Sequence, residues 1–310
     1  GTDPEVGPRV TVANTGTEAV TPPPVEMRVG NLTLPPGNVG QLAPGGEATV
    51  EFRHRFATAG PQVVVARVSA GDDLPGDDQV ERVVAVRKRL PVLLVDGNPA
   101  GPFFDRAASF TALALAPAAT VAVGGGAGDA YLMEPKLMAA ADLTGNTAFE
   151  PYPVVVLADV PRLPAPIADR LAAHVTGGGG LLVLAGPRCE PGFFNDWTGG
   201  DGRLLPAPLG PLATDITGVT PALATFDHPA LALLADPKTS DLGSGQVAAW
   251  RRVEEDPEAA RRVAARFTNG VPFLLARAYG QGRVAVATGG FDNRSGSLPA
   301  RRSFVPLVHE

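Results

Sequence analysis

The chain has 310 residues and a net charge of −6, and apolar side chains make up 45% of it. This size suits two domains with buried cores, and the lack of any basic stretch in the sequence argues against binding to a nucleic-acid backbone. A single cysteine, Cys189, excludes an internal disulfide, and the longest weakly polar stretch, residues 110–128, is too broken by Pro117 and by glycines to span a bilayer.

Residues 1–89 contain short stretches in which apolar and polar side chains alternate, as they do in strands with one buried face. Proline and glycine cluster between these stretches, and none of them has helical spacing. Short strands separated by frequent turn signals predict an all-β immunoglobulin-like sandwich as the first domain. The predicted strands lie at residues 10–13, 25–29, 48–56, 62–68 and 80–86.

The pattern changes near residue 90, where the second predicted domain, residues 90–310, begins. Three continuous apolar runs indicate parallel strands buried on both faces, and segments with helical spacing lie between the strands. Strands that alternate with helices predict an open, mainly parallel sheet. The strands are residues 91–95, 153–158 and 181–185, and the helices are residues 103–115 and 164–175.

The last third of the chain is different again. Asn269-Gly270 separates two apolar stretches, residues 261–268 and 271–278, and both turn residues tolerate a positive φ, which predicts a β-hairpin. A further strand is expected at residues 283–288 and a final helix at residues 303–309. We expect this hairpin to extend one edge of the parallel sheet in the antiparallel sense.

Three segments of the first domain, residues 12–16 (VANTG), 42–45 (LAPG) and the acidic residues 72–78, resemble the cell-adhesion-related bacterial domain known as CARDB. This resemblance covers residues 1–89 and implies an immunoglobulin-like fold. A domain of this kind would serve as a spacer or an adhesion module.

The second domain resembles the class I glutamine amidotransferase-like superfamily, in particular its trehalose-utilisation-type branch, which implies a flavodoxin-like layout. The residues that carry this resemblance are 93–97 (LLVDG), 152–157 (YPVVVL), 174–182 (HVTGGGGLL), 227–229 (DHP) and 279–284 (YGQGRV). The tandem of domains also resembles part of large, membrane-anchored bacterial proteins that contain a von Willebrand factor A domain. That arrangement implies an envelope location, with membrane attachment only through segments outside these residues.

The catalytic triad of the amidotransferases is missing at the matching positions. Their nucleophile is a Cys on a tight turn directly after a strand, but here the strand runs into Gly186 and Pro187, and Cys189 follows too late. No His follows the late strand at residues 283–288. A different pairing of Cys189 with His228 remains open. The alternative is that Cys189 is a partly buried thiol and that the His228 ring orders its own loop.

No metal or other cofactor is expected. The four histidines lack metal-ligand spacing, and the glycine clusters at residues 124–126 and 177–180 lack the context of a phosphate-binding loop. An acidic loop could attract calcium, but it lacks the alternating oxygen spacing of a calcium loop, so a solvated turn is the competing interpretation. Its carboxylates are Asp72, Asp73, Asp77 and Asp78.

A ligand cleft, if the fold has one, should lie at the carboxyl ends of the parallel strands. Polar residues follow the predicted strands there, although the same residue types also suit turns. The candidate residues are Asp96, Asn98, Asp159, Arg188, His228, Asp292 and Asn293.

These features together predict a non-catalytic interaction or scaffold module of a bacterial envelope protein, with a protein or a carbohydrate as partner. One alternative is an enzyme that processes a carbohydrate or another small molecule and uses His228 with the strand-end acids. A second alternative is a sugar-binding module without turnover.

Overall fold

The computed structural model describes residues 7–69, 76–117 and 132–310. The chain divides into two compact units, Gly1–Lys88 and Arg89–Glu310, and each is described by itself. Two of the acidic-loop candidates, Asp72 and Asp73, and the glycine cluster at residues 124–126 lie outside the described residues.

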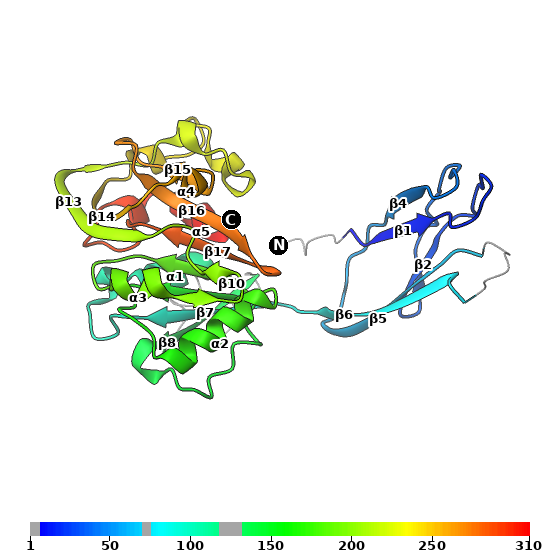
Figure 1. Ribbon diagram of the computed structural model, residues 1–310, viewed down its shortest axis with the longest axis horizontal. Coiled ribbons are helices and arrows are strands. Elements are labelled where there is room, and N and C mark those ends of the chain that lie inside the picture. The colour runs from blue at the N-terminus through cyan, green and yellow to red at the C-terminus, as the bar shows by residue number, and fades with distance from the viewer. Residues whose placement is uncertain (1–6, 70–75, 118–131) are drawn as a thin grey trace. The chain divides into compact units, whose positions relative to one another are not determined.

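The described part of the first unit contains two antiparallel β-sheets (Figure 1). One is a two-stranded sheet, and the other is a four-stranded sheet with the order β3-β2-β5-β6. The two-stranded sheet pairs β1 (Arg9–Ala13) with β4 (Glu47–Glu51), and the larger sheet contains β2 (Glu26–Val29), β3 (Leu32–Thr33), β5 (Gly60–Arg67) and β6 (Gln79–Val86).

A small apolar core lies between these strands. In β2 every second side chain is buried, so Met27 and Val29 face the core while Glu26 and Arg28 face solvent. Asn14 closes the turn after β1, because its side-chain amide donates to the carbonyl oxygens of Glu18, Leu42 and Ala43 at 2.8, 3.1 and 3.2 Å. The other core residues include Val25, Leu34, Val39, Leu42, Val50, Phe52, Val64 and Ala66.

The predicted fold class is wrong, because the structure shows no clear all-β immunoglobulin-like sandwich followed by a second domain. The described residues form a mixed α/β structure whose largest sheet has seven strands and is mostly parallel. The physical reason lies in the first unit, where one layer has only two strands and β6 exposes seven of its eight residues. A sandwich requires two sheets that bury their inner faces against each other along the strands.

The seven-stranded sheet of the second unit has the order β15-β16-β17-β10-β9-β7-β8. Neighbours from β17 to β8 are parallel, whereas β16 pairs antiparallel with both β17 and β15. The strands are β7 (Leu90–Asp96), β8 (Met133–Ala139), β9 (Val154–Ala158), β10 (Gly180–Leu184), β15 (Val263–Arg266), β16 (Pro272–Tyr279) and β17 (Gly282–Ala287).

Helices cover both faces of this sheet, so the central strands are apolar throughout. Val92 and Leu94 pack in one cluster with α1 (Ala107–Leu115) and α5 (Phe304–His309). Leu93 and Val95 pack in the other cluster with α2 (Ala165–Thr176) and α3 (Pro191–Asp196). Successive side chains of β7 therefore point into the two clusters in turn, one on each face of the sheet.

A long segment separates β10 from β15 and forms a further antiparallel pair, β13 (Leu209–Val219) with β14 (Val247–Val253). The segment also contains β11 (Thr198–Gly199), β12 (Gly202–Arg203) and α4 (Pro257–Ala260). None of the helices in the described ranges combines the length and the apolar character that crossing a bilayer requires.

Candidate functional site

Three carboxylates lie at the carboxyl ends of parallel strands, where the sequence predicted a cleft. Asp96 ends β7, Asp159 follows β9 and Asp292 follows β17, and each of them is at most 3% exposed. A buried carboxylate is stable only when it is paired or hydrogen-bonded. The partners of these three groups therefore decide what this edge of the sheet can do.

Asp96 is paired with an arginine that the sequence analysis did not identify. Its Oδ2 lies 2.8 Å from Nε and 2.7 Å from Nη2 of Arg106, the residue directly before α1. Its Oδ1 accepts the backbone N–H of Asn98 at 2.9 Å. Both oxygens are thus engaged, and the carboxylate ties the end of β7 to the start of α1.

Asp159 is held in an unusual backbone conformation. Among the described residues it is the one non-glycine residue with a positive φ, at 52°. Its Oδ1 accepts the backbone N–H of Arg188 at 2.8 Å, and a Cβ at Gly186 would overlap this carboxylate. Burial is the largest influence on Asp159 and raises the pKa of its carboxyl above the ordinary value.

Arg294 links the second and third carboxylates. Its Nη2 lies 3.3 Å from Oδ2 of Asp159 and 3.1 Å from Oδ2 of Asp292. The other oxygen of Asp292 accepts the backbone N–H of Ser295 at 2.8 Å. A guanidinium between two buried carboxylates offsets the repulsion between them, and it leaves neither carboxylate unpaired.

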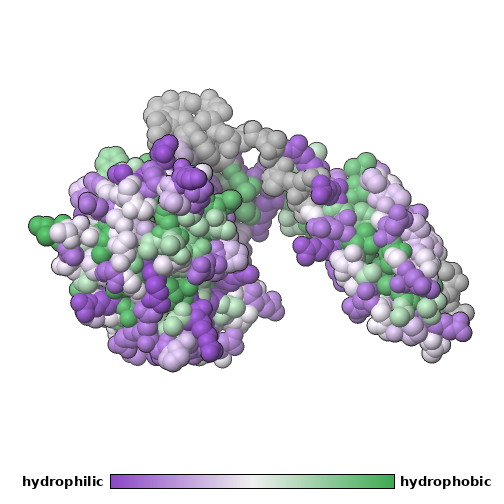
Figure 2. Space-filling model, turned by 90° about the horizontal axis from the view of Figure 1, so that it is seen from above, coloured by the Kyte–Doolittle hydropathy of each residue, from purple (hydrophilic) through white to green (hydrophobic). Residues whose placement is uncertain are grey.

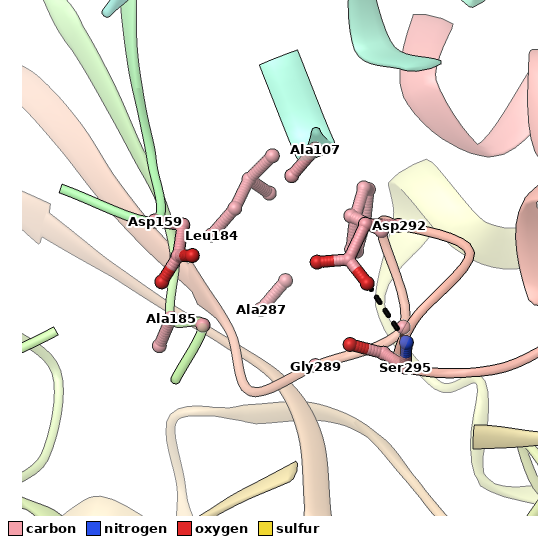
Figure 3. A pocket seen from close by; sticks show the side chains of 11 residues that line it. Ala107, Asp159, Leu184, Ala185, Ala287, Gly289, Asp292 and Ser295 are labelled. Atoms are coloured by element: carbon pink, nitrogen blue, oxygen red, sulfur yellow. Dashed lines mark hydrogen bonds between the residues drawn. The ribbon is translucent and has the colours of Figure 1, made fainter. Parts of the chain in front are cut away.

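The space between these groups is small. Figure 3 shows Asp159 and Asp292 on two sides of a cavity, with Leu184, Ala287 and Gly289 between them. The cavity has a volume of about 10 Å³, which is room for one water molecule at most. The space between Asp159 and Asp292 is therefore too small to hold a ligand larger than water in this structure.

The raised pKa of Asp159 predicts a pH-dependent effect of replacing it. Because the folded pKa is raised, the stability that Asp159 contributes is fully present below 3.8, its ordinary pKa, and is lost as the pH rises through the folded pKa. We expect Asp159→Asn to gain stability relative to the wild type across this window and to match or exceed it at pH 7. Asparagine keeps an acceptor for the Arg188 N–H and tolerates a positive φ.

Asp159→Ala is the matched comparison, because it removes the acceptor and places alanine at a positive φ. We expect it to lower the free energy of unfolding by about 2 kcal/mol. Urea titrations between pH 3.5 and 7 would measure both variants. Tryptophan fluorescence is the probe, since both tryptophans, Trp197 and Trp250, belong to the second unit. An Asn variant that loses stability relative to the wild type as the pH rises would contradict the assignment.

Cys189 lies in the turn after β10 and is 2% exposed. Burial and the nearby charge of Asp159 raise the pKa of its thiol from 9.0 to about 12. The Sγ atom lies 4.0 Å from the carbonyl oxygen of Leu184. The thiol is therefore neutral at physiological pH, and a neutral thiol is a poor nucleophile.

Arg251 of β14 holds the turn that contains Cys189. It is 6% exposed, and its guanidinium donates to three backbone carbonyl oxygens. These are the oxygens of Gly186 at 3.1 Å, Pro187 at 2.8 Å and Cys189 at 2.6 Å. A buried cation with several carbonyl acceptors fixes the backbone around it, so this turn is held in a single arrangement.

His228 is engaged by its own loop. Its Nδ1 accepts the backbone N–H of Ala230 at 3.2 Å, at the start of the short helix η5 (Pro229–Leu234). This contact caps the helix and occupies one of the two ring nitrogens. The structure gives no contact between His228 and Cys189 or the strand-end acids among the described residues.

Three further candidate residues, Asn98, Arg188 and Asn293, form hydrogen bonds at this edge of the sheet through their backbone N–H groups. The N–H of Asn293 donates to the carbonyl oxygen of Phe104 at 3.0 Å, and Asn98 and Arg188 donate their N–H groups to Asp96 and Asp159. The described part of the acidic loop includes Asp77 and Asp78. Within the described ranges, no group of three His, Cys, Asp or Glu residues could hold a metal ion.

The sequence analysis missed the arginines that neutralise or hold this edge, Arg106, Arg251 and Arg294. Arg294 lies two residues after Asp292, and this short spacing was a usable signal. Arg106 and Arg251 are far in sequence from the groups they contact, by 10 residues for Asp96 and by 62 residues for Cys189. No local pattern distinguishes them from surface arginines.

No protein-family model matches the chain, and no curated protein matches it. Among solved structures, two Salmonella proteins are similar to it. The cytoplasmic protein STM3548 from Salmonella typhimurium is 13% identical, with 74% of this chain and 86% of that chain covered and a TM-score of 0.46. The cytoplasmic protein STM1381 from Salmonella typhimurium LT2 is 16% identical, with 76% of this chain and 91% of that chain covered and a TM-score of 0.45.

A β-galactosidase from the haloarchaeon Halorubrum lacusprofundi is also similar, at 15% identity and a TM-score of 0.40. The match covers 70% of this chain and 30% of that enzyme. At these scores and identities, none of the similarities supports an inference about activity. The resemblances to CARDB and to the amidotransferase-like superfamily therefore stay predictions.

Proposed function

We propose that the chain is a non-catalytic interaction module of a bacterial envelope protein. The observation that carries the proposed lack of catalysis is the state of Cys189, which is buried, neutral and held in a turn by Arg251. Thiol-dependent acyl transfer requires an accessible thiolate beside a base. The envelope location rests on the resemblance of the tandem alone.

The strand-end acids also support a structural role. A general base needs a lone pair that is free to accept a proton from a substrate. The oxygens of Asp96, Asp159 and Asp292 instead contact arginines and backbone N–H groups. These contacts stabilise the loops at the strand ends, which favours a structural role for the acids over the carbohydrate-processing alternative.

An exposed aromatic pair next to this edge supplies a contact surface. Phe103 and Phe104 are 45% and 57% exposed, and their ring centroids lie 5.2 Å apart in an edge-to-face arrangement. The backbone of Phe104 is fixed by the N–H of Asn293. Phenylalanine is enriched at protein interfaces, which favours a protein partner for this pair. Hydrophobic residues also reach the surface of the molecule elsewhere (Figure 2).

The proposal is tested by a glutamine-hydrolysis assay with ammonia detection. We expect the wild type and Cys189→Ser to give the same rate as buffer. His228→Ala serves as the control for chemistry that depends on the imidazole. Turnover by the wild type that disappears in Cys189→Ser would overturn the proposal, and glutamine turnover that disappears only in His228→Ala would overturn it in favour of a hydrolase that depends on the imidazole.

A further inference from the structure

Among the described residues, no strand pairs with the outer edge of β6. β6 is the last strand of the four-stranded sheet, where β5 pairs with its inner side (Figure 1). Seven of its eight residues are exposed, and Val80, Val83 and Val84 are 41%, 66% and 39% exposed. Long, exposed, apolar edge strands act as templates for pairing with another strand, and proteins commonly block them with charged side chains, proline, bulges or a covering segment. The charged residues of β6 are Glu81 and Arg82. β6 contains no proline and has a regular register with β5.

The hydrogen-bond pattern shows which backbone groups face outward. The N–H of Val68 donates to the carbonyl oxygen of Asp78 at 2.8 Å, so this pair is a hydrogen-bonded pair of the β5–β6 ladder. Opposite residues alternate between hydrogen-bonded and non-bonded pairs in an antiparallel ladder. Val80, Arg82 and Val84 therefore bond to β5. The residues between and after them, Gln79, Glu81, Val83 and Ala85, direct their N–H and C=O groups to the open edge.

One local contact agrees with this assignment. Nη1 of Arg82 donates to the carbonyl oxygen of Glu81 at 3.1 Å, on the exposed side of the strand. That oxygen must therefore point away from β5. The contact is solvent-exposed and is easily exchanged for a strand-to-strand hydrogen bond, because a surface hydrogen bond contributes little net stability.

The segment that contains β6 and its flanking residues avoids like charges and opposes unlike charges in an antiparallel register centred on Val83. A two-fold axis normal to the sheet places side chains of the same face opposite each other in the two copies of β6. The axis must therefore lie midway between the two copies of a single residue. An axis at Glu81 or Arg82 would oppose like charges directly, which is destabilising. An axis at Val83 places Val83 against its own equivalent, and Val80 against Val86. The same register places Asp78 against Lys88 of the second copy.

We propose that the chain forms a homodimer by antiparallel pairing of β6 with β6 of a second copy, centred on Val83. The pairing joins two four-stranded sheets into one continuous sheet, which satisfies the outward N–H and C=O groups of both strands and covers part of the exposed valines. The occupant is a second copy because Asp78 and Lys88, which flank β6, have opposite charges and come opposite each other under this symmetry. The inference concerns the first unit and does not depend on the absence of chemistry in the second.

Sedimentation equilibrium of the full chain at 1 to 200 µM tests the pairing. We expect the wild type to approach twice the 31.8 kDa of one chain as the concentration rises. Val83→Lys opposes two ammonium groups on the axis and should raise the dissociation constant by at least about tenfold. Val63→Lys is the matched control, because Val63 is 39% exposed and lies opposite Val83 on the inner strand β5. It should leave the dissociation constant unchanged.

A charge reversal tests the register even if Val83→Lys disturbs folding. Asp78→Lys and Lys88→Asp should each weaken the dimer, and the double variant should restore it. A wild type that stays monomeric over the whole range overturns the proposal, including the case in which β6 pairs with a strand of an unrelated protein. A dimer that Val83→Lys and both charge reversals leave intact also overturns it, since the contact must then lie elsewhere.

Discussion

In the native protein, Cys189 should react with a thiol reagent at pH 8 roughly a thousand-fold more slowly than in the urea-unfolded chain. The rise of its pKa from 9.0 to about 12 lowers the thiolate fraction by about that factor, because the thiolate is the reacting species. Burial adds to the effect, since the 2% exposed side chain is closed to the reagent. The residue is the one cysteine of the chain, so the signal is unambiguous.

The measurement is the release of thionitrobenzoate from a disulfide reagent, followed with and without 8 M urea. Cys189→Ser provides the blank in both conditions. Labelling of the native protein at the unfolded rate would contradict the buried, neutral thiol and would reopen the catalytic interpretation. Labelling that rises with urea in parallel with tryptophan fluorescence would show that the thiol is exposed only when the second unit unfolds.

Arg251→Met should lower the free energy of unfolding of the second unit by about 3 to 5 kcal/mol. Hydrogen bonds to a charged group contribute about 1.5 to 3 kcal/mol each, and loss of the guanidinium leaves the carbonyl oxygens of Gly186, Pro187 and Cys189 without this donor. The three contacts act as a unit, so their effects do not simply add. Urea denaturation followed by tryptophan fluorescence measures the change.

Arg251→Lys is the control for charge alone. An ammonium group cannot reproduce the planar fork that reaches three carbonyl oxygens, so we expect it to recover only part of the loss. The Met variant should also label faster at Cys189 than the wild type under native conditions, since the turn is no longer held. A loss below about 1 kcal/mol for Arg251→Met would contradict the role assigned to this arginine.

Much of the local structure of the second unit was predictable. The apolar runs before Asp96 and Asp159 are strands β7 and β9, and the Asn269-Gly270 turn joins β15 to β16. These predictions succeeded because a strand buried on both faces is apolar without a break, and that pattern is local. Five described strands of this unit were not predicted, namely β8, β11, β12, β13 and β14. β8 has Glu, Pro and Lys within its run, and β13 exposes most of its length.

The sandwich prediction failed for a physical reason that local patterns do not contain. Alternation in residues 80–86 indicated a strand with one buried face, and the strand is present as β6, but seven of its eight side chains are exposed. Alternation shows that a segment can form a strand. It does not show that a second sheet exists to cover the strand, since burial depends on contacts between distant segments.

In the candidate site, too, local features were predictable from the sequence, whereas contacts between distant residues were not. The sequence by itself determined that Asp96, Asp159 and Asp292 follow parallel strands and that no catalytic cysteine follows β10 directly, because strand ends and turns are local features. Only the tertiary structure decided that Arg106 pairs with Asp96 and that Arg294 links Asp159 to Asp292. It also decided that Arg251 holds the turn of a buried Cys189 and that no described strand pairs with the outer edge of β6. Each of these facts depends on which distant residues share a space, and the free energy of a buried charge depends on that choice of partner.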